Sequence, residues 1–190
     1  MPTPRLRVLI ADDHVATRAA LRADLEEDGI EVCAEVGTGA HAIDAALSLR
    51  PDVCLIDIEM PDGGIVAAET ISQALPSVKI VLMTATPDEK SALAAARAGA
   101  VGYLDKARDP RWLPQVVRAV AAGQAEYPQR FIPGLLRAIR AADPGVQEPE
   151  RPATLRSRKD PNALASGFWR GVSQAGSRER KSTDHRSRPA

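Results

Sequence analysis

Residues 53–58 read VCLIDI, a short apolar run that is broken by one acid, Asp57. Four similar runs, rich in valine, isoleucine and leucine, recur at intervals of about 24 residues along the chain. The five runs span residues 6–11, 30–36, 53–58, 78–83 and 101–104. Short runs with little alternation between apolar and polar residues are typical of β-strands that are covered on both faces. The repeat therefore predicts five buried strands.

The segments between these runs have the spacing of amphipathic helices. Apolar residues lie four apart in them, at Leu21 and Leu25, Ile43 and Leu47, Ile71 and Leu75, and, after the last run, Trp112, Val116 and Val120. A strand and a helix that alternate five times predict a parallel sheet with helices on both faces. We expect an α/β fold of the flavodoxin-like type, a (βα)5 doubly wound parallel sheet with strand order 2-1-3-4-5.

The chain has 190 residues, and its 25 basic side chains balance 25 acidic ones. The balance hides an asymmetry, because residues 1–142 carry 15 basic and 19 acidic side chains and residues 154–190 carry nine and three. The tail is basic and rich in serine, which predicts disorder. We expect a domain over 5–123, an amphipathic linker helix over 124–142, and a linker with a basic low-complexity tail over 143–190.

Composition and motif spacing argue against several other classes of protein. No apolar run approaches the roughly 18 residues of a membrane span, and the first residues lack a signal-peptide pattern. Cys33 and Cys54 lie inside apolar runs, which favours buried thiols in a reducing cytoplasm over a disulfide framework or a cysteine zinc site. His14 and His41 have no cysteine or second histidine at ligand spacing and fall at helix starts, so we interpret them as solvated helix caps rather than metal ligands.

Polar side chains follow four of the five predicted strands. The first strand ends in Asp12 and Asp13, the third in Asp57, the fourth in Thr84 and the fifth in Lys106. The second strand ends without a reactive group, as expected for an edge strand. Because ligands of open α/β sheets bind at the carboxyl ends of the strands, these side chains are predicted to converge on one rim.

Three neighbouring carboxylates repel one another unless a cation neutralises them. Oxygen ligands suit Mg²⁺, and a lysine with a hydroxyl beside the cation suits a phosphoryl group in transfer. We predict that Asp57 is the nucleophile that forms an acyl phosphate. Asp12 and Asp13 are predicted to hold the metal, with the backbone carbonyl near Glu59.

These stretches resemble the receiver domain of a two-component response regulator of the NarL/FixJ type. The matching segments are VLIADDH at 8–14, DVCLIDIEMP at 52–61, VLMTA at 81–85 and AGAVGYLDK at 98–106. The resemblance covers about residues 5–123. It implies a phosphoacceptor signalling protein rather than an enzyme with an external substrate.

The resemblance also implies a role for each rim residue. Asp57 would accept a phosphoryl group from a histidine kinase, and Asp12, Asp13 and Asp57 would hold Mg²⁺. Thr84 and Lys106 would bind the phosphoryl oxygens. Tyr103 would be the switch aromatic that turns inward as Thr84 moves toward the phosphate; an amphipathic ring at the sheet edge is the plainer alternative.

The loop after the acceptor departs from the family pattern. It reads MPDGGI at residues 60–65, one residue shorter than the usual form. The double glycine, Gly63 and Gly64, is expected to make the turn, since glycine tolerates conformations that other residues avoid. The acceptor is expected to survive, with a changed loop and kinase preference.

A second motif suggests a different class of function. Residues 37–42 read GTGAHA, which fits the dinucleotide fingerprint, and Asp57 lies 20 residues after Gly37. This would predict a nicotinamide-dependent oxidoreductase. The motif follows the predicted edge strand, however, and this alternative leaves Asp12, Thr84 and Lys106 without roles.

The output of the chain stays open between three hypotheses. A regulator of this type would carry a helix-turn-helix domain of about 60 residues, whereas 37 residues follow position 153 and lack its pattern. We interpret that domain as missing or degenerate, so that a receiver of transcription-regulator descent acts by protein contacts. The alternatives are DNA binding by the basic tail with a homodimer formed on phosphorylation, and a phosphate sink.

Overall fold

The computed structural model describes residues 5–107 and 110–142. Its sheet contains five parallel strands: β1 (Arg7–Ala11), β2 (Glu31–Val36), β3 (Val53–Asp57), β4 (Lys79–Thr84) and β5 (Gly102–Asp105). The strands lie in the order β2-β1-β3-β4-β5, so the predicted doubly wound topology is confirmed, with β3 in the centre and β2 at an edge.

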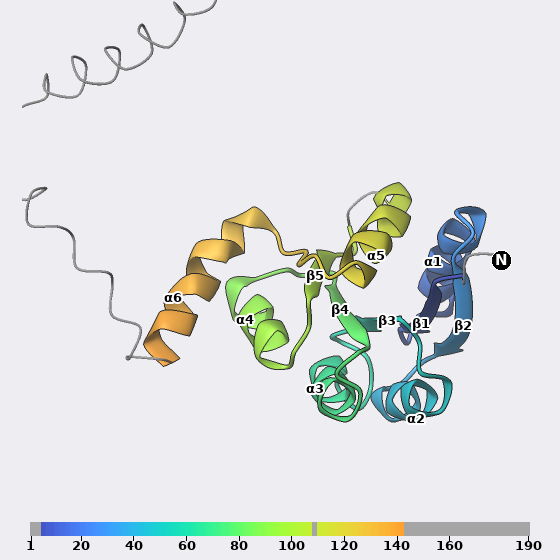
Figure 1. The fold of residues 1–190 in the computed structure, drawn as a ribbon, viewed down its shortest axis with the longest axis horizontal. Coiled ribbons are helices and arrows are strands. Elements are labelled where there is room, and N and C mark those ends of the chain that lie inside the picture. The colour runs from blue at the N-terminus through green and yellow to red at the C-terminus, as the bar shows by residue number, and fades with distance from the viewer. Residues whose placement is uncertain (1–4, 108–109, 143–190) are drawn as a thin grey trace, which may run out of the picture. The chain divides into compact units, whose positions relative to one another are not determined.

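Helices cover both faces of this sheet (Figure 1). The helices are α1 (Val15–Glu27), α2 (Gly39–Leu49), α3 (Gly64–Ala74), α4 (Glu89–Arg97), α5 (Leu113–Ala121) and α6 (Ile132–Ala142). Side chains of α1 and α5 form one apolar core with Val8, Ile10 and Leu55. Those of α2, α3 and α4 form the other with Leu9 and Ile56. Because alternate residues of one strand enter opposite cores, both faces of the sheet are apolar.

Local capping determines where several helices begin and end. Thr38 accepts a hydrogen bond from the His41 backbone N–H at the start of α2, and Asp88 accepts one from Ser91 at the start of α4. Gly29 and Gly99 take positive φ angles of 74° and 84° after α1 and α4, a conformation that glycine favours at helix ends. Before α5, Pro110–Trp112 forms a 3₁₀ turn, and α5 itself begins at Leu113.

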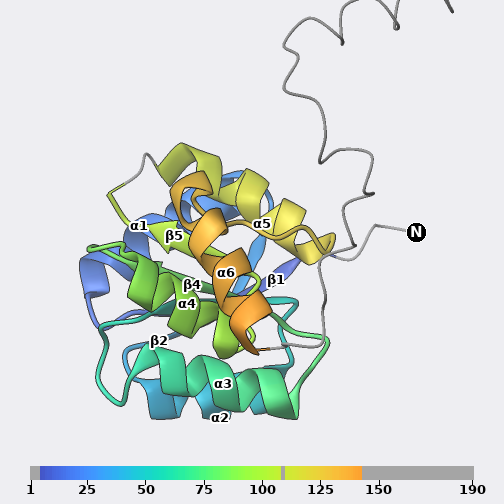
Figure 2. The same cartoon turned by 90° about the vertical axis from the view of Figure 1, so that its left-hand side faces the viewer.

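The amphipathic segment at 124–142 is helical only in its second part. Glu126 forms a parallel bridge with Gly102 of β5, and a short 3₁₀ turn, Gln129–Phe131, leads into α6. Helix α6 lies against α4 (Figure 2). Leu135 is buried there, whereas Leu136 and Ile139 are exposed. The predicted tail, residues 143–190, lies outside the described residues.

The two cysteines are free thiols, and burial raises the pKa of Cys54 to about 12. At about pH 8 roughly one Cys54 thiol in ten thousand is then ionised. Because the thiolate is the reactive form, we expect Cys54 to resist thiol reagents until the protein unfolds. A Cys33→Ser variant isolates Cys54, and labelling with and without urea measures the difference. Fast stoichiometric labelling of the folded variant would contradict the expectation.

Candidate functional site

The carboxyl ends of the strands bring the predicted acidic and basic side chains to one rim. Asp12 follows β1 and is fully buried, and Asp57 ends β3 with 1% of its surface exposed. Lys106 follows β5, and its backbone N–H donates to the Thr84 carbonyl at 2.8 Å. The parallel register therefore places residues from three parts of the sequence next to one another.

The Lys106 ammonium joins the two buried carboxylates. Its Nζ lies 2.7 Å from Asp12 Oδ2 and 2.8 Å from Asp57 Oδ1. Burial alone lowers the pKa of Lys106, but hydrogen bonds and charge interactions with Asp12 and Asp57 outweigh it, so the pKa is raised. A raised pKa keeps the ammonium charged at neutral pH, and its stabilising effect is lost only as the pH rises through that value.

Backbone N–H groups also contact the same carboxylates. The His14 N–H donates to Asp12 Oδ1 at 2.8 Å, and the Glu59 N–H lies 3.3 Å from Asp57 Oδ1. These donors orient two negative groups that would otherwise repel each other.

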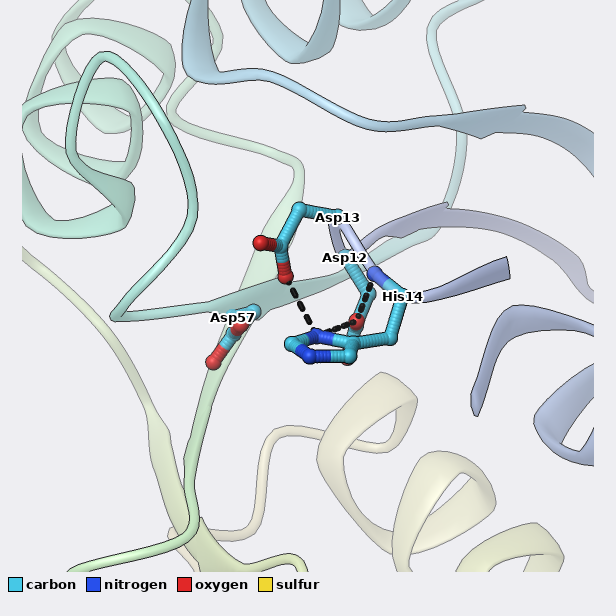
Figure 3. A group of neighbouring side chains, drawn as sticks. All are labelled: Asp12, Asp13, His14 and Asp57. Atoms are coloured by element: carbon cyan, nitrogen blue, oxygen red, sulfur yellow. Dashed lines mark hydrogen bonds and ion pairs between the residues drawn. The ribbon is translucent and has the colours of Figure 1, made fainter. Parts of the chain in front are cut away.

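The two carboxylates belong to a larger group of side chains that also includes Asp13 and the imidazole of His14 (Figure 3). One ligand atom from each of Asp12, Asp13, His14 and Asp57 lies within 4.8 Å of the others. His14 does not cap α1 with its side chain; its Nδ1 lies 2.6 Å from Asp13 Oδ1. The three carboxylates are the hard oxygen donors that Mg²⁺ prefers, so the donor set fits this ion.

A polar chain leads from the rim toward α4. The Thr86 hydroxyl lies 2.9 Å from Glu59 Oε1, and the Thr86 N–H donates to Thr84 Oγ1 at 3.0 Å. Thr84 is itself almost fully buried. Neither the Glu59 side chain nor Thr86 was predicted from the sequence; a hydroxyl two residues beyond Thr84 was the one available signal.

The shortened loop after Asp57 turns with two left-handed residues. Asp62 has a φ of 67° and Gly63 a φ of 78°, whereas Gly64 has no positive φ. Gly64 is required for another reason, because a Cβ there would lie 1.9 Å from the Asp57 carbonyl oxygen. The two glycines therefore have different roles: Gly63 makes the turn, and Gly64 lets the start of α3 approach the backbone of Asp57.

Tyr103 is buried already in this structure, with none of its surface exposed. Its hydroxyl lies 2.7 Å from Ser91 Oγ and accepts a hydrogen bond from the Asp88 N–H at 3.1 Å. The ring thus packs in the core beside α4, and its hydroxyl contacts the start of that helix.

The dinucleotide-like motif at 37–42 forms the turn between β2 and α2. It follows the edge strand β2, Thr38 caps α2, and the Gly39 N–H donates to the Pro61 carbonyl at 2.9 Å. The glycine lies against Asp62, where a Cβ would approach within 3.2 Å. Backbone packing between two loops accounts for Gly39 without a nucleotide.

None of the helices in the described ranges, 5–107 and 110–142, is long and apolar enough to cross a membrane.

The sequence matches one family of known proteins and several individual relatives. Residues 8–118 match the family of response regulator receiver domains. The uncharacterized transcriptional regulatory protein YxjL of Bacillus subtilis is 39% identical over 129 residues, which are 67% of this chain and 59% of YxjL. Response regulator UvrY of Escherichia coli is 35% identical over 121 residues, or 63% of this chain and 56% of UvrY. The chain thus spans less than two thirds of the length of these relatives.

Solved structures agree with this similarity. A two-component response regulator of the LuxR family from Aurantimonas sp. SI85-9A1 has a TM-score of 0.65 and 29% identity, covering 72% of this chain and 99% of that one. The signal receiver domain of the response regulator NarL from Mycobacterium tuberculosis has a TM-score of 0.62 and 27% identity, covering 64% and 100%.

Proposed function

The chain belongs to the response regulator receiver domain family, and from this premise we propose that Asp57 accepts a phosphoryl group from a histidine kinase. The proposal is supported above all by the position of Lys106, whose ammonium contacts Asp12 and Asp57 at one rim. A cation beside two buried carboxylates keeps the attacking carboxylate ionised and fixes its orientation.

Transfer forms one bond and breaks another. A carboxylate oxygen of Asp57 attacks phosphorus, the phosphorus–nitrogen bond of the donor phosphohistidine breaks, and the imidazole leaving group takes a proton from solvent. The structure gives Asp57 Oδ1 its contacts with Lys106 and Glu59, so we assign the attack to Oδ2. Lys106 and the Thr84 hydroxyl then hold phosphoryl oxygens, over which the charge is spread in the transition state.

A divalent cation belongs to the same proposal. We assign Mg²⁺ to Asp12, Asp13 and Asp57, with the backbone carbonyl of Glu59. When bound, the ion neutralises charge on the phosphoryl oxygens. The exposed Asp13 carboxylate, beside the buried Asp12, opens the site to solvent and hence to the cation and the donor.

Removal of the Lys106 charge tests the electrostatic part of the site. A Lys106→Met variant leaves Asp12 and Asp57 facing each other, so we expect its unfolding free energy to fall by about 3 kcal/mol. Mg²⁺ should restore more stability to this variant than to the wild type, because the ammonium and the ion compete for the same oxygens. Urea unfolding with and without Mg²⁺ measures both effects.

Lys90→Met, on the exposed side of α4, is the matched control and should change stability little. An equal response of Lys106→Met and the wild type to Mg²⁺ would contradict a shared oxygen site.

We propose that this receiver descends from a regulator of transcription. Its output is then exerted through protein contacts that form when phosphorylation changes the conformation of the domain. YxjL carries the name of a transcriptional regulatory protein. The tail that suggests DNA binding as an alternative lies outside the described residues. Duplex DNA binding that weakens with salt would assign the output to that tail, and a monomeric phosphorylated protein without DNA binding would favour a phosphate sink.

The central experiment is labelling by a small phosphodonor. We expect the full chain to gain one phosphoryl group in the presence of Mg²⁺, as measured by intact mass, and to lose it on treatment with hydroxylamine, which cleaves acyl phosphates. Chelation of Mg²⁺ should stop the labelling. A label that survives hydroxylamine would contradict an aspartyl phosphate.

A further inference from the structure

The segment at residues 124–142, named here the docked arm, continues the sheet beyond β5. The Tyr103 N–H donates to the Glu126 carbonyl at 2.8 Å, and the Glu126 N–H donates to the Val101 carbonyl at 2.9 Å. These two bonds pair the arm with the edge strand that carries Tyr103. The arm therefore covers an edge that would otherwise expose unpaired backbone groups.

Two aromatic rings of the docked arm enclose Tyr103. Tyr127 stacks on it with ring centroids 6.2 Å apart and planes 11° apart. Phe131 meets it edge-on, with centroids 5.9 Å apart and planes 75° apart. Both arrangements are favourable for aromatic pairs. The Tyr127 hydroxyl donates to the Ala100 carbonyl at 2.7 Å, which fixes the stacked ring.

The rest of the arm is attached to α4. Arg137 of α6 pairs with Glu89 at 3.1 Å, and Leu135 is 8% exposed. Gly134 lies so close to Glu89 that a Cβ there would approach its Cγ to 3.0 Å. Helix α6 therefore contacts the start of α4. The Tyr103 hydroxyl contacts the same region, at Asp88 and Ser91.

One loop connects these contacts with the phosphoacceptor rim. Thr84 begins the loop that leads to α4, and Asp88 ends it. Thr86, in the middle, contacts Glu59, whose backbone N–H lies near Asp57. The position that Thr84 needs to reach a phosphoryl oxygen and the buried position of Tyr103 are therefore set by the same loop.

We propose that Phe131 and Tyr127 are positioning residues for the phosphoacceptor site. They hold Tyr103 buried, and Tyr103 holds the end of the loop whose beginning carries Thr84. Docking of the arm and a phosphoryl group on Asp57 then stabilise each other. Such coupling is reciprocal: the factor by which a phosphoryl group on Asp57 stabilises the docked arm equals the factor by which the docked arm strengthens binding at Asp57. This inference rests on the proposed function of Asp57.

The test uses the full chain with Mg²⁺ and beryllium fluoride, which adds to a carboxylate as a stable stand-in for the phosphoryl group. Titration followed by fluorine NMR gives the affinity. We expect Phe131→Ala to weaken it about three- to tenfold, the range of one aromatic pair. Phe131→Tyr retains the ring and should restore the affinity. Leu136→Ala, on the exposed side of α6 (51% exposed), is the matched control and should leave it unchanged.

Hydrogen exchange gives a second readout that a loss of stability would not imitate. In the wild type, beryllium fluoride should slow exchange of the Glu126 amide, and in Phe131→Ala this slowing should shrink. If circular dichroism shows that Phe131→Ala is unfolded, two milder variants carry the test. Tyr127→Phe removes the hydrogen bond to Ala100, and Arg137→Ala removes the surface ion pair with Glu89, with weakening of about threefold or less expected.

Two failures can be told apart. Equal affinities for the wild type and the folded arm variants overturn the coupling and leave the phosphoacceptor intact. Absence of beryllium fluoride binding by the wild type overturns the proposed function and the coupling with it.

Discussion

An Asp57→Asn variant is expected to lose all labelling by a small phosphodonor under conditions in which the wild type gains one phosphoryl group. An amide is far less nucleophilic than a carboxylate and cannot form the acyl phosphate. The fold should persist, because asparagine has the same shape and keeps an oxygen that can accept from the Lys106 ammonium. Intact mass after incubation with Mg²⁺ and the donor measures the effect.

Asp62→Asn is the matched control for this variant. Asp62 lies in the loop that follows the acceptor and has a positive φ of 67°, which asparagine also tolerates. Its labelling should equal that of the wild type. Persistent labelling of Asp57→Asn, located by peptide mapping to another carboxylate, would reject Asp57 as the acceptor.

A Gly64→Ala variant is expected to lose about 3 kcal/mol of unfolding free energy and much of its labelling rate. The added Cβ would lie 1.9 Å from the Asp57 carbonyl oxygen and 2.9 Å from Ile58 Cα. Both are backbone atoms of the acceptor segment, so relief of the clash must displace the backbone of Asp57 or the first turn of α3 that packs against it. Urea unfolding and the labelling rate measure the two consequences.

Gly29→Ala separates this close approach from ordinary backbone strain. Gly29 has a φ of 74° but nothing within 4 Å of the added Cβ, so only the conformational cost of about 1 kcal/mol is expected, with unchanged labelling. Equal stability losses for the two variants would mean that the loop relaxes around Gly64 without strain.

Much of this fold was predictable from local patterns in the sequence and from the general rules of parallel-sheet topology. Short valine- and isoleucine-rich runs alternate with segments of helical spacing, and this pattern gave the five strands, their helices and the strand order. Because parallel strands end at the same edge, the position of Asp57 relative to Asp12 and Lys106 followed from the pattern alone. The functional roles of these residues stay predictions until they are tested.

Other features could not be predicted, since they depend on packing between segments far apart in the chain. No spacing rule relates Tyr103 to Phe131, or says that residues before α6 pair with β5 instead of extending the helix. The need for Gly64 also arises only when its helix is seated against the backbone of Asp57.

Sequence by itself therefore determined that Asp12, Asp57 and Lys106 meet at the rim, because strand periodicity and the direction of parallel strands are properties of the chain. The tertiary structure alone decided how those residues are held: the two carboxylates on one ammonium, and Tyr103 enclosed by the docked arm. The reason is physical. A periodic pattern selects the face of an element, whereas distances between side chains are set by close packing of all the elements together.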